Sequence, residues 1–326
     1  MANKVKIGVT SLPNPVMPGH IKVGEYDKYE KEIKAHIKSY IDMLLPDSPD
    51  LIILPECCNR FTPVCYETRD VFYKDVKKYY RYAENRFVEY MKDVAVNNNT
   101  NIAYSAVRFV PETERYLNST VYITRNGSIA GIYDKNHLVI EENTECNIDY
   151  GSKAELIKLD FGKVATAICF DLNFDELMYK YKSEKPDLTV FASAYHGGLR
   201  QEQFAYMCRS YFASSVLGLE SRIINPYGKT VAATTNYTPC VTAEINLDYE
   251  LCHIDYNFEK IKQAKAKYKD ALTVYDPGYA GSVMLTCESE DISVEEIIKE
   301  FDIEKLDDYF KRALAHRNSH LPEVQL

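Results

Sequence analysis

The sequence lacks the features that are typical of membrane-spanning, nucleic-acid-binding and metal-binding proteins. No run of apolar residues approaches the roughly 18 that a membrane span needs. Basic residues are in the minority, with 39 Lys and Arg against 48 Asp and Glu, so the net charge is −9. This balance argues against a nucleic-acid partner and against a polybasic membrane anchor. The seven histidines are scattered, and no CxxC or HExxH spacing indicates a metal site.

The sequence also lacks the marks of an exported disulfide scaffold. Its N-terminus, MANKVKIGVTSLP, has no long apolar segment before a small-residue cleavage site. The nine cysteines are an odd number, and 326 residues are enough to bury a core without disulfides. We therefore expect a cytoplasmic protein with reduced thiols, at least one of which is available for chemistry.

Strand and helix patterns intermix along the chain, without a repeat, a low-complexity tract or a Gly/Ser linker. They predict one α/β domain with mixed sheets covered by helices. From about residue 256 the pattern predicts a mostly helical, charged segment. The predicted helices are 28–45, 83–96, 174–182 and 201–216, and the predicted strands are 4–11, 50–54, 102–110, 119–124, 129–133, 156–159, 163–169, 188–192, 221–224, 230–234 and 241–245.

Three chemically reactive side chains lie at the ends of predicted strands. Glu56 comes shortly after DLIIL, Lys135 shortly after IAGIY, and Cys169 ends KVATAIC. Ligands of open α/β sheets gather at the carboxyl ends of strands, so these three can converge there. Their roles are complementary, because a thiol nucleophile needs a base and an ammonium group stabilises an oxyanion. The backbone N–H of Phe170 is a natural second oxyanion donor. Taken singly, each residue has a plain alternative as a buried thiol, a capping carboxylate or a surface charge.

The segments around these residues resemble a known family. Leu-Pro-Glu at 54–56, Tyr-Asp-Lys-Asn-His-Leu at 133–138 and Ile-Cys-Phe-Asp-Leu-Asn-Phe at 168–174 are similar to the three motifs of the nitrilase superfamily of carbon–nitrogen hydrolases. Order and spacing agree, and the resemblance extends over about residues 4–250. It implies a four-layer αββα sandwich, which we assign to residues 1–255. A helical C-terminal extension, 256–326, would follow, and it is the candidate for an oligomer interface.

The resemblance also implies roles for the site residues. Glu56 would be the general base, Lys135 the oxyanion-stabilising cation and Cys169 the nucleophile that forms a thioester acyl-enzyme. No metal or other cofactor is implied. Many members have a second glutamate that orients this triad, and our candidate is Glu145, with Glu142 second. A homodimer or higher homo-oligomer is also implied. The amphipathic C-terminal helices would either pack on their own domain or exchange across a dimer.

The residues after the nucleophile bear on the substrate. Cys-Phe-Asp resembles the amidase and carbamoyl-hydrolase branches, whereas true nitrilases more often have Cys-Trp-Glu, and tryptophan is absent here. A small linear amide or N-carbamoyl amine is therefore favoured over a nitrile. Tyr195, His196 and Arg200 follow the strand LTVFASA and are candidates for the pocket wall. Arg200 would pair with a substrate carboxylate, and a surface loop is the alternative for all three.

Other functions stay open at this point. Cys169 paired with His137 or His196 would be a papain-like arrangement. An N-acyltransferase or a nitrile hydrolase could use the same triad. A non-catalytic binding protein on this scaffold is a further alternative, although the presence of Glu56, Lys135 and Cys169 argues against it.

Overall fold

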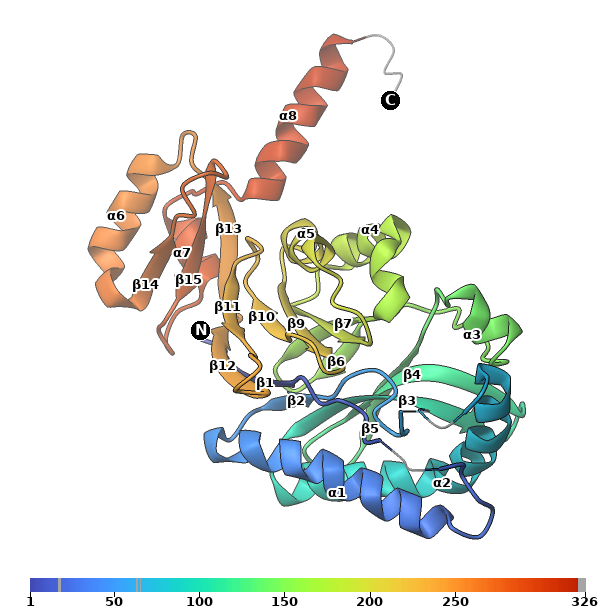
Figure 1. Cartoon of the computed structure of the whole chain (residues 1–326). Coiled ribbons are helices and arrows are strands. Elements are labelled where there is room, and N and C mark those ends of the chain that lie inside the picture. The colour runs from blue at the N-terminus through green and yellow to red at the C-terminus, as the bar shows by residue number, and fades with distance from the viewer. Residues whose placement is uncertain (17–18, 63, 65, 322–326) are drawn as a thin grey trace. The chain divides into compact units, whose positions relative to one another are not determined.

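The computed structural model describes residues 1–16, 19–62, 64 and 66–321 and divides into two compact units (Figure 1). The larger unit comprises Lys6–Glu244. The smaller comprises Met1–Val5 together with the chain from Ile245 onward. Within the described part of the chain, no helix combines the length and the apolar composition that crossing a membrane requires.

The described residues of the larger unit build two six-stranded sheets. In the first sheet, of order β12-β1-β2-β3-β4-β5, the pairs β1–β2 and β2–β3 are parallel. In the second, of order β11-β10-β9-β8-β7-β6, β7, β8 and β9 are parallel neighbours. The strands of the first sheet are β1 Lys4–Thr10, β2 Leu51–Ile53, β3 Asn101–Val110, β4 Arg115–Ile123, β5 Ile129–Asp134 and β12 Cys240–Asn246. Those of the second are β6 Ile157–Leu159, β7 Gly162–Ile168, β8 Leu188–Ser193, β9 Tyr211–Val216, β10 Arg222–Ile224 and β11 Thr230–Ala233.

The two sheets pack face to face, and helices cover their outer faces. Buried hydroxyls connect the sheets, with the Tyr122 hydroxyl of β4 2.7 Å from Thr166 Oγ1 of β7. Helices α1 (Tyr26–Leu44) and α2 (Arg69–Asn97) lie on the first sheet (Figure 1). Helix α5 (Leu199–Cys208) packs on the second, where Phe204 meets Phe212 of β9, and α4 (Asp175–Glu184) lies beside α5. This is the predicted αββα sandwich.

Two predicted helices have different bounds. Helix α2 begins at Arg69, well before the predicted start at 83, because its aromatic-rich first turns also bury one face. The Thr68 side chain caps it by accepting from the Val71 N–H. The predicted helix 201–216 is wrong in its second half. The left-handed residue Arg209 ends α5, and the fully buried segment YFASSV forms strand β9.

The smaller unit contains strands that the expectation of a mainly helical extension missed. Strands β13 (Tyr249–His253), β15 (Ser282–Cys287) and β14 (Leu272–Tyr275) form an antiparallel sheet in that order. Its core also takes residues from helices α6 (Phe258–Tyr268) and α7 (Val294–Glu300). In the last helix, α8 (Leu306–His320), Leu306 is the buried residue. The assignment of the catalytic domain to 1–255, and of the extension to an oligomer interface, stays a prediction.

Candidate active site

The ends of three strands place the three predicted residues around one cavity. Glu56 follows β2, and Lys135 follows β5 of the same sheet, whereas Cys169 follows β7 of the opposing sheet. All three line a cavity of about 340 Å³ in the larger unit. Residues far apart in sequence therefore meet because two sheets present their strand ends to the same space.

Lys135 lies between two carboxylates. Its Nζ is 2.9 Å from Glu56 Oε1 and 2.7 Å from Glu142 Oε2. Asn118 Nδ2 donates to the same two side chains, at 2.8 Å to Glu56 Oε1 and 3.3 Å to Glu142 Oε1. The Ala194 N–H donates to Glu56 Oε2 at 3.0 Å. Both oxygens of Glu56 are thus held, and the carboxylate has one defined orientation.

The charges of Glu56 and Lys135 support each other. Burial alone would raise the pKa of Glu56, but the Lys135 ammonium and its hydrogen bond hold that pKa below the ordinary carboxyl value. Burial would likewise lower the pKa of Lys135, but Glu56, Cys169 and Glu142 together hold it above the ordinary lysine value. At neutral pH the pair is therefore a carboxylate and an ammonium ion.

Cys169 lies at a sharp change of backbone direction between β7 and a 3₁₀ turn, Cys169–Asn173. Its φ is +49°, a left-handed conformation that is uncommon for a residue with a side chain and is often found at functional sites. Burial and the negative charge of Glu56 raise the pKa of the Cys169 thiol, and Lys135 opposes this only in part. The resting side chain is therefore a thiol, and it needs a base when it attacks.

The carboxylate of Asp171 holds this turn in place by accepting hydrogen bonds. Its Oδ2 accepts from the Tyr133 hydroxyl at 2.8 Å and from the Ile168 N–H at 3.0 Å. Its Oδ1 accepts from the His137 N–H at 2.8 Å and lies 2.9 Å from His137 Nδ1. The fully buried carboxylate of Asp171 thus joins the segment that carries Lys135 to the segment that carries Cys169.

The supporting carboxylate at Lys135 is Glu142 and not Glu145. Helix α3 (Ile140–Thr144) is a single turn, and Glu142 reaches back from it, so that its Oε2 also accepts from the Val139 N–H at 2.9 Å. Glu145 follows that turn and is exposed, outside the set of residues that line the cavity. The preference for Glu145 is corrected because its exposed side chain follows the last residue of α3, whereas Glu142 within α3 contacts Lys135.

Comparison with known proteins identifies the family of this chain. The profile of the carbon–nitrogen hydrolase family matches residues 28–250. This chain belongs to that family. The carbon–nitrogen hydrolase is 25% identical to a probable nitrilase of Schizosaccharomyces pombe in an alignment of 226 residues that covers 60% of this chain and 76% of that protein.

Solved structures share the fold of this carbon–nitrogen hydrolase. Saccharomyces cerevisiae Nit3, a member of branch 10 of the nitrilase superfamily, has a TM-score of 0.60 at 19% identity, over 82% of this chain and 96% of that chain. An amidase from Nesterenkonia sp. AN1, with acrylamide added to its active-site cysteine, has a TM-score of 0.59 at 13% identity, over 74% of this chain and 92% of that chain. These likenesses confirm the nitrilase-type αββα sandwich.

The residues predicted for the pocket wall of this hydrolase occupy other positions. Arg200 Nη2 lies 2.6 Å from Asp175 Oδ1, and its Nε donates to the Leu172 carbonyl, so α4 supplies the carboxylate that we expected from a substrate. His196 accepts from the Gly198 N–H at 3.1 Å. The Phe170 ring packs edge-on against Phe174, whereas the role predicted for this residue concerns its backbone N–H. None of these three residues is in the set that lines the cavity.

Tyr195 differs from its neighbours. Burial, together with the nearby Cys169, raises its pKa to about 12. Its hydroxyl is buried, but Tyr195 is not among the residues that line the cavity. In the loop after β8 it is Ala194 that lines the cavity, and its N–H donates to Glu56.

The structure does not support a Cys–His pair. Both ring nitrogens of His137 lie against carboxylates, with Nδ1 2.9 Å from Asp171 and Nε2 2.8 Å from Glu176. The same imidazole stacks on Phe174 at a centroid distance of 4.0 Å. His137 therefore holds the turn that carries Cys169, and neither of its nitrogens is left to accept the thiol proton.

Most of the cavity wall consists of residues that the sequence motifs did not predict. Arg60 lies in the segment after β2 and donates through Nη1 to the Tyr73 hydroxyl at 2.7 Å. The first turns of α2 provide further wall residues, which the late predicted start of this helix hid. The missed lining residues are Cys57, Arg60, Arg69, Phe72, Tyr73, Val139, Cys146 and Ala194.

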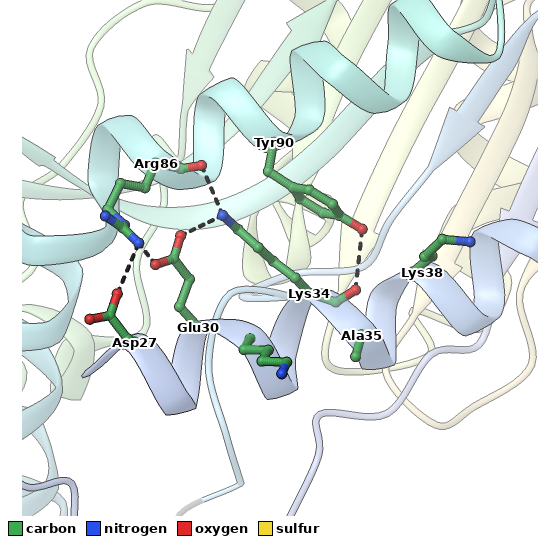
Figure 2. Close-up of a pocket in the computed structure, with 8 residues that line it drawn as sticks. Asp27, Glu30, Lys34, Ala35, Lys38, Arg86 and Tyr90 are labelled. Atoms are coloured by element: carbon green, nitrogen blue, oxygen red, sulfur yellow. Dashed lines mark hydrogen bonds and ion pairs between the residues drawn. The ribbon is translucent and has the colours of Figure 1, made fainter. Parts of the chain in front are cut away.

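A second pocket, between α1 and α2, has a different character (Figure 2). Its charges satisfy one another, because Glu30 pairs with Lys34 and with Arg86, whose Nη2 also lies 2.9 Å from Asp27. No cysteine lines it. Elsewhere in the described residues, no group of three or more His, Cys, Asp or Glu is arranged to hold a metal ion.

Proposed function

We propose that this carbon–nitrogen hydrolase cleaves a small linear amide or N-carbamoyl amine through a thioester on Cys169. One observation carries the proposal. Glu56 is buried, held in one orientation and paired with Lys135 at 2.9 Å, in the same cavity that Cys169 lines. A base, a cation and a nucleophile around one cavity of this size are the groups that acyl transfer to and from a thiol requires.

The acylation step follows from these roles. Glu56 accepts the thiol proton as Cys169 Sγ attacks the carbonyl carbon of the substrate. The oxyanion that forms is stabilised by the Lys135 ammonium and the Phe170 N–H. When it collapses, the carbon–nitrogen bond breaks and the leaving amine takes the proton from Glu56. Ammonia or an amine departs, and the acyl group remains on sulfur.

Deacylation uses the same groups in reverse. Glu56 accepts a proton from water as the water oxygen attacks the thioester carbon. The second tetrahedral intermediate loses the Cys169 sulfur, which takes the proton back from Glu56. The released acid and the resting thiol complete the cycle. Because Glu56 must exchange a proton twice in each turnover, its fixed orientation serves both halves of the reaction.

The test compares two cysteines of the same cavity. Wild-type protein is offered a panel of amides, N-carbamoyl amino acids and nitriles, and ammonia release and the intact protein mass are measured. Cys169→Ala should lose turnover by at least about 10³-fold and gain no acyl mass, with unchanged thermal unfolding. Cys146→Ala removes a second thiol that lines the cavity. This variant should keep the wild-type turnover and should still gain the acyl mass. Full activity of Cys169→Ala would sink the proposal.

The panel also decides the class of substrate. Release of ammonia from amides or carbamoyl compounds, with nitriles inert, is the expected outcome. Preferential conversion of nitriles, or transfer of the acyl group to an added amine in place of water, would replace the proposal by one of the alternatives. A cytoplasmic location and a homo-oligomeric state stay predictions.

A further inference from the structure

The turn that carries the nucleophile is held from outside by Arg200. This five-residue 3₁₀ turn, Cys169–Asn173, contains both the nucleophile and the Phe170 N–H, the second oxyanion donor of the proposed reaction. A turn this short cannot pair all of its own carbonyl groups as a long helix does, so these groups need other donors. The source of those donors therefore decides how firmly the turn is fixed.

Three successive carbonyl groups of the turn accept hydrogen bonds. Those of Phe170 and Asp171 accept from groups three residues later in the sequence, at 3.1 Å in both cases. The carbonyl of Leu172 accepts from Arg200 Nε at 3.0 Å, and Arg200 lies on α5, 28 residues later. The first two contacts shape the turn locally, whereas the contact with Arg200 attaches it to a helix of the sandwich.

The guanidinium group of Arg200 is itself held in one orientation. Its Nη2 lies 2.6 Å from Asp175 Oδ1 in the first turn of α4, and its Nη1 donates to Gln203 Oε1 at 2.9 Å. The donors of a guanidinium group lie in one plane, so contacts with Asp175 and with the Leu172 carbonyl together define its orientation. Arg200 therefore connects the nucleophile turn, α4 and α5 through one rigid group.

The side chain of Leu172 is held by the same part of the chain. Leu172 is fully buried, and a Cβ at Gly197, in the loop before α5, would lie 2.6 Å from Leu172 Cδ2. Gly197 has a φ of +75°, which also favours glycine. The Ala194 N–H of this loop donates to Glu56 Oε2. The segment between β8 and α5, with Arg200 at its end, thus contacts both the general base and the nucleophile turn.

We propose that Arg200 is a positioning residue that aligns the Phe170 N–H with the oxyanion of the proposed reaction. Cys169 is the first residue of the turn and directly follows β7, so the strand fixes its position. Phe170 lies between this fixed end and Leu172, so the direction of its N–H depends on both. Oxyanion donors act through preorganised geometry, and a donor that moves loses much of its effect. This inference rests on the proposed function, in which Arg200 acts through the turn.

The experiment compares two reactions of Cys169 that differ in their need for an oxyanion donor. In acylation by p-nitrophenyl butyrate, the sulfur attacks the carbonyl carbon, an oxyanion forms and p-nitrophenolate leaves. In alkylation by allyl bromide, the sulfur displaces bromide and no oxyanion forms. Peptide mass spectrometry after timed quenching gives the rate constant of each reaction at Cys169, and the ratio of acylation to alkylation is the readout. A change in the thiol or in its base affects both reactions and cancels in this ratio.

Arg200→Gln should lower the ratio about 10-fold, which is less than the roughly 10²–10³-fold loss caused by deleting an oxyanion donor outright. For any amide that the wild type hydrolyses, kcat should fall by a similar factor while KM stays within about 2-fold. Arg200→Lys retains a cation that can reach the Leu172 carbonyl but lacks the planar fork, so it should return the ratio to within about 3-fold of wild type.

Two more variants separate positioning from general destabilisation. Asp175→Asn weakens the contact that orients Arg200 and should lower the ratio about 3-fold. Arg81→Gln removes an arginine of α2 that pairs with Glu114 and does not line the cavity. This control should keep the wild-type ratio. Thermal unfolding is measured for every variant, so that a loss of fold is recognised.

The possible outcomes are distinguishable. A wild-type ratio in folded Arg200→Gln overturns the positioning role, and so do equal losses of acylation and alkylation, which indicate a general disturbance of the turn. If Arg200→Gln does not fold, Asp175→Asn decides, because the Asp175 side chain is exposed, and a wild-type ratio in that variant overturns the role.

Failure of the proposed function has a different signature. If the ester acylates Cys169 of the wild type but no amide or carbamoyl compound is hydrolysed, the proposed function fails and the ratio still decides the role of Arg200. If neither the ester nor any compound of the panel acylates Cys169, the proposed function and the positioning role fail together.

Discussion

At the scale of single residues, the main feature of the site is that Lys135 is buried between Glu56 and Glu142. Two carboxylates thus contact one ammonium group. Glu56 faces the cavity with Cys169, and Glu142 approaches the ammonium group from α3. The second carboxylate holds Lys135 in place and adds to the charge that keeps it protonated. Glu142 is therefore a positioning residue in our proposal, and it acts through Lys135.

Glu142→Gln and Glu145→Gln form a matched pair that tests this role. Glu142→Gln should lower kcat of amide hydrolysis about 100-fold with little change in KM, because Lys135 loses one of its two anchors. Glu145→Gln, an exposed residue on the same segment, should stay within about 2-fold of wild type. Steady-state kinetics at pH 7 provide the measurement, and Glu142→Asp should recover part of the activity. Equal losses in the two Gln variants would contradict the assignment.

Replacing Asn118 tests the role of Glu56 as the general base through the pH profile of kcat/KM. The Asn118 side chain donates to Glu56 Oε1 and so contributes to the lowered pKa of that carboxylate. Asn118→Ala removes this contribution, so the Glu56 pKa should rise and the acid limb of the kcat/KM profile should move to higher pH. Acylation at pH 7 should fall about 10-fold. A lower rate with an unmoved acid limb would assign Asn118 to packing alone.

At the residue scale, the sequence predicted the triad but not its surroundings. Glu56, Lys135 and Cys169 could be found because each lies in a motif at a strand end. Arg60 lies in no such pattern, and only the fold shows that it lines the same cavity. The role of Arg200 could not be judged from the sequence either, because its pairing with Asp175 depends on how α4 and α5 pack.

At the scale of elements, the turn after β7 depends on a contact with the loop after β5. Asp171 receives hydrogen bonds from both segments, and His137 lies between Asp171 and Glu176. The hydrogen bond to Asp171, followed by that to Glu176, raises the pKa of His137 although burial opposes the shift. The native state therefore binds this proton more tightly than the unfolded chain does.

His137→Gln tests whether proton binding by His137 contributes to the stability of the fold. A raised native pKa contributes stability that is fully present below about pH 6.5, the ordinary histidine value, and is lost as pH rises through the native value. The difference in free energy of unfolding between wild type and His137→Gln should therefore be larger at pH 6 than at pH 9, as measured by urea titration. Glu176→Gln, which removes only the exposed partner, should show a weaker trend in the same direction. A constant difference across this range would refute the linkage.

Sequence patterns located most elements, and the misses share a physical cause. Segment 211–216 was predicted as the end of a helix, but it is β9, a strand buried on both faces. Such strands have no alternation of polar and apolar residues, so periodicity cannot separate them from a buried helix. Strand β15, which is also fully buried, was missed for the same reason. Helix α2 was shortened because tyrosines, and not aliphatic residues, make its first apolar turns.

At the scale of the whole molecule, the site exists only because the two sheets of the larger unit face each other. One sheet carries Glu56 and Lys135, and the other carries Cys169. The face-to-face packing came from the family resemblance, since strand patterns alone do not say which sheets pair. Buried hydroxyl pairs such as Thr10 with Ser215, at 3.1 Å, and Tyr122 with Thr166 connect the sheets with defined geometry.

The pair Tyr122 and Thr166 allows the packing of the sheets to be tested by a double-mutant cycle. Tyr122→Phe leaves the buried Thr166 hydroxyl without its partner across the sheets and should cost about 1–3 kcal/mol in free energy of unfolding. Thr166→Val should cost a similar amount. Because one interaction is lost in both cases, the double variant should be less destabilised than the sum of the two, by about 1 kcal/mol. Urea unfolding of the four proteins gives this coupling. Strict additivity would mean that the hydroxyl pair does not connect the sheets in solution, and the approach of Cys169 to Glu56 would then rest on apolar packing alone.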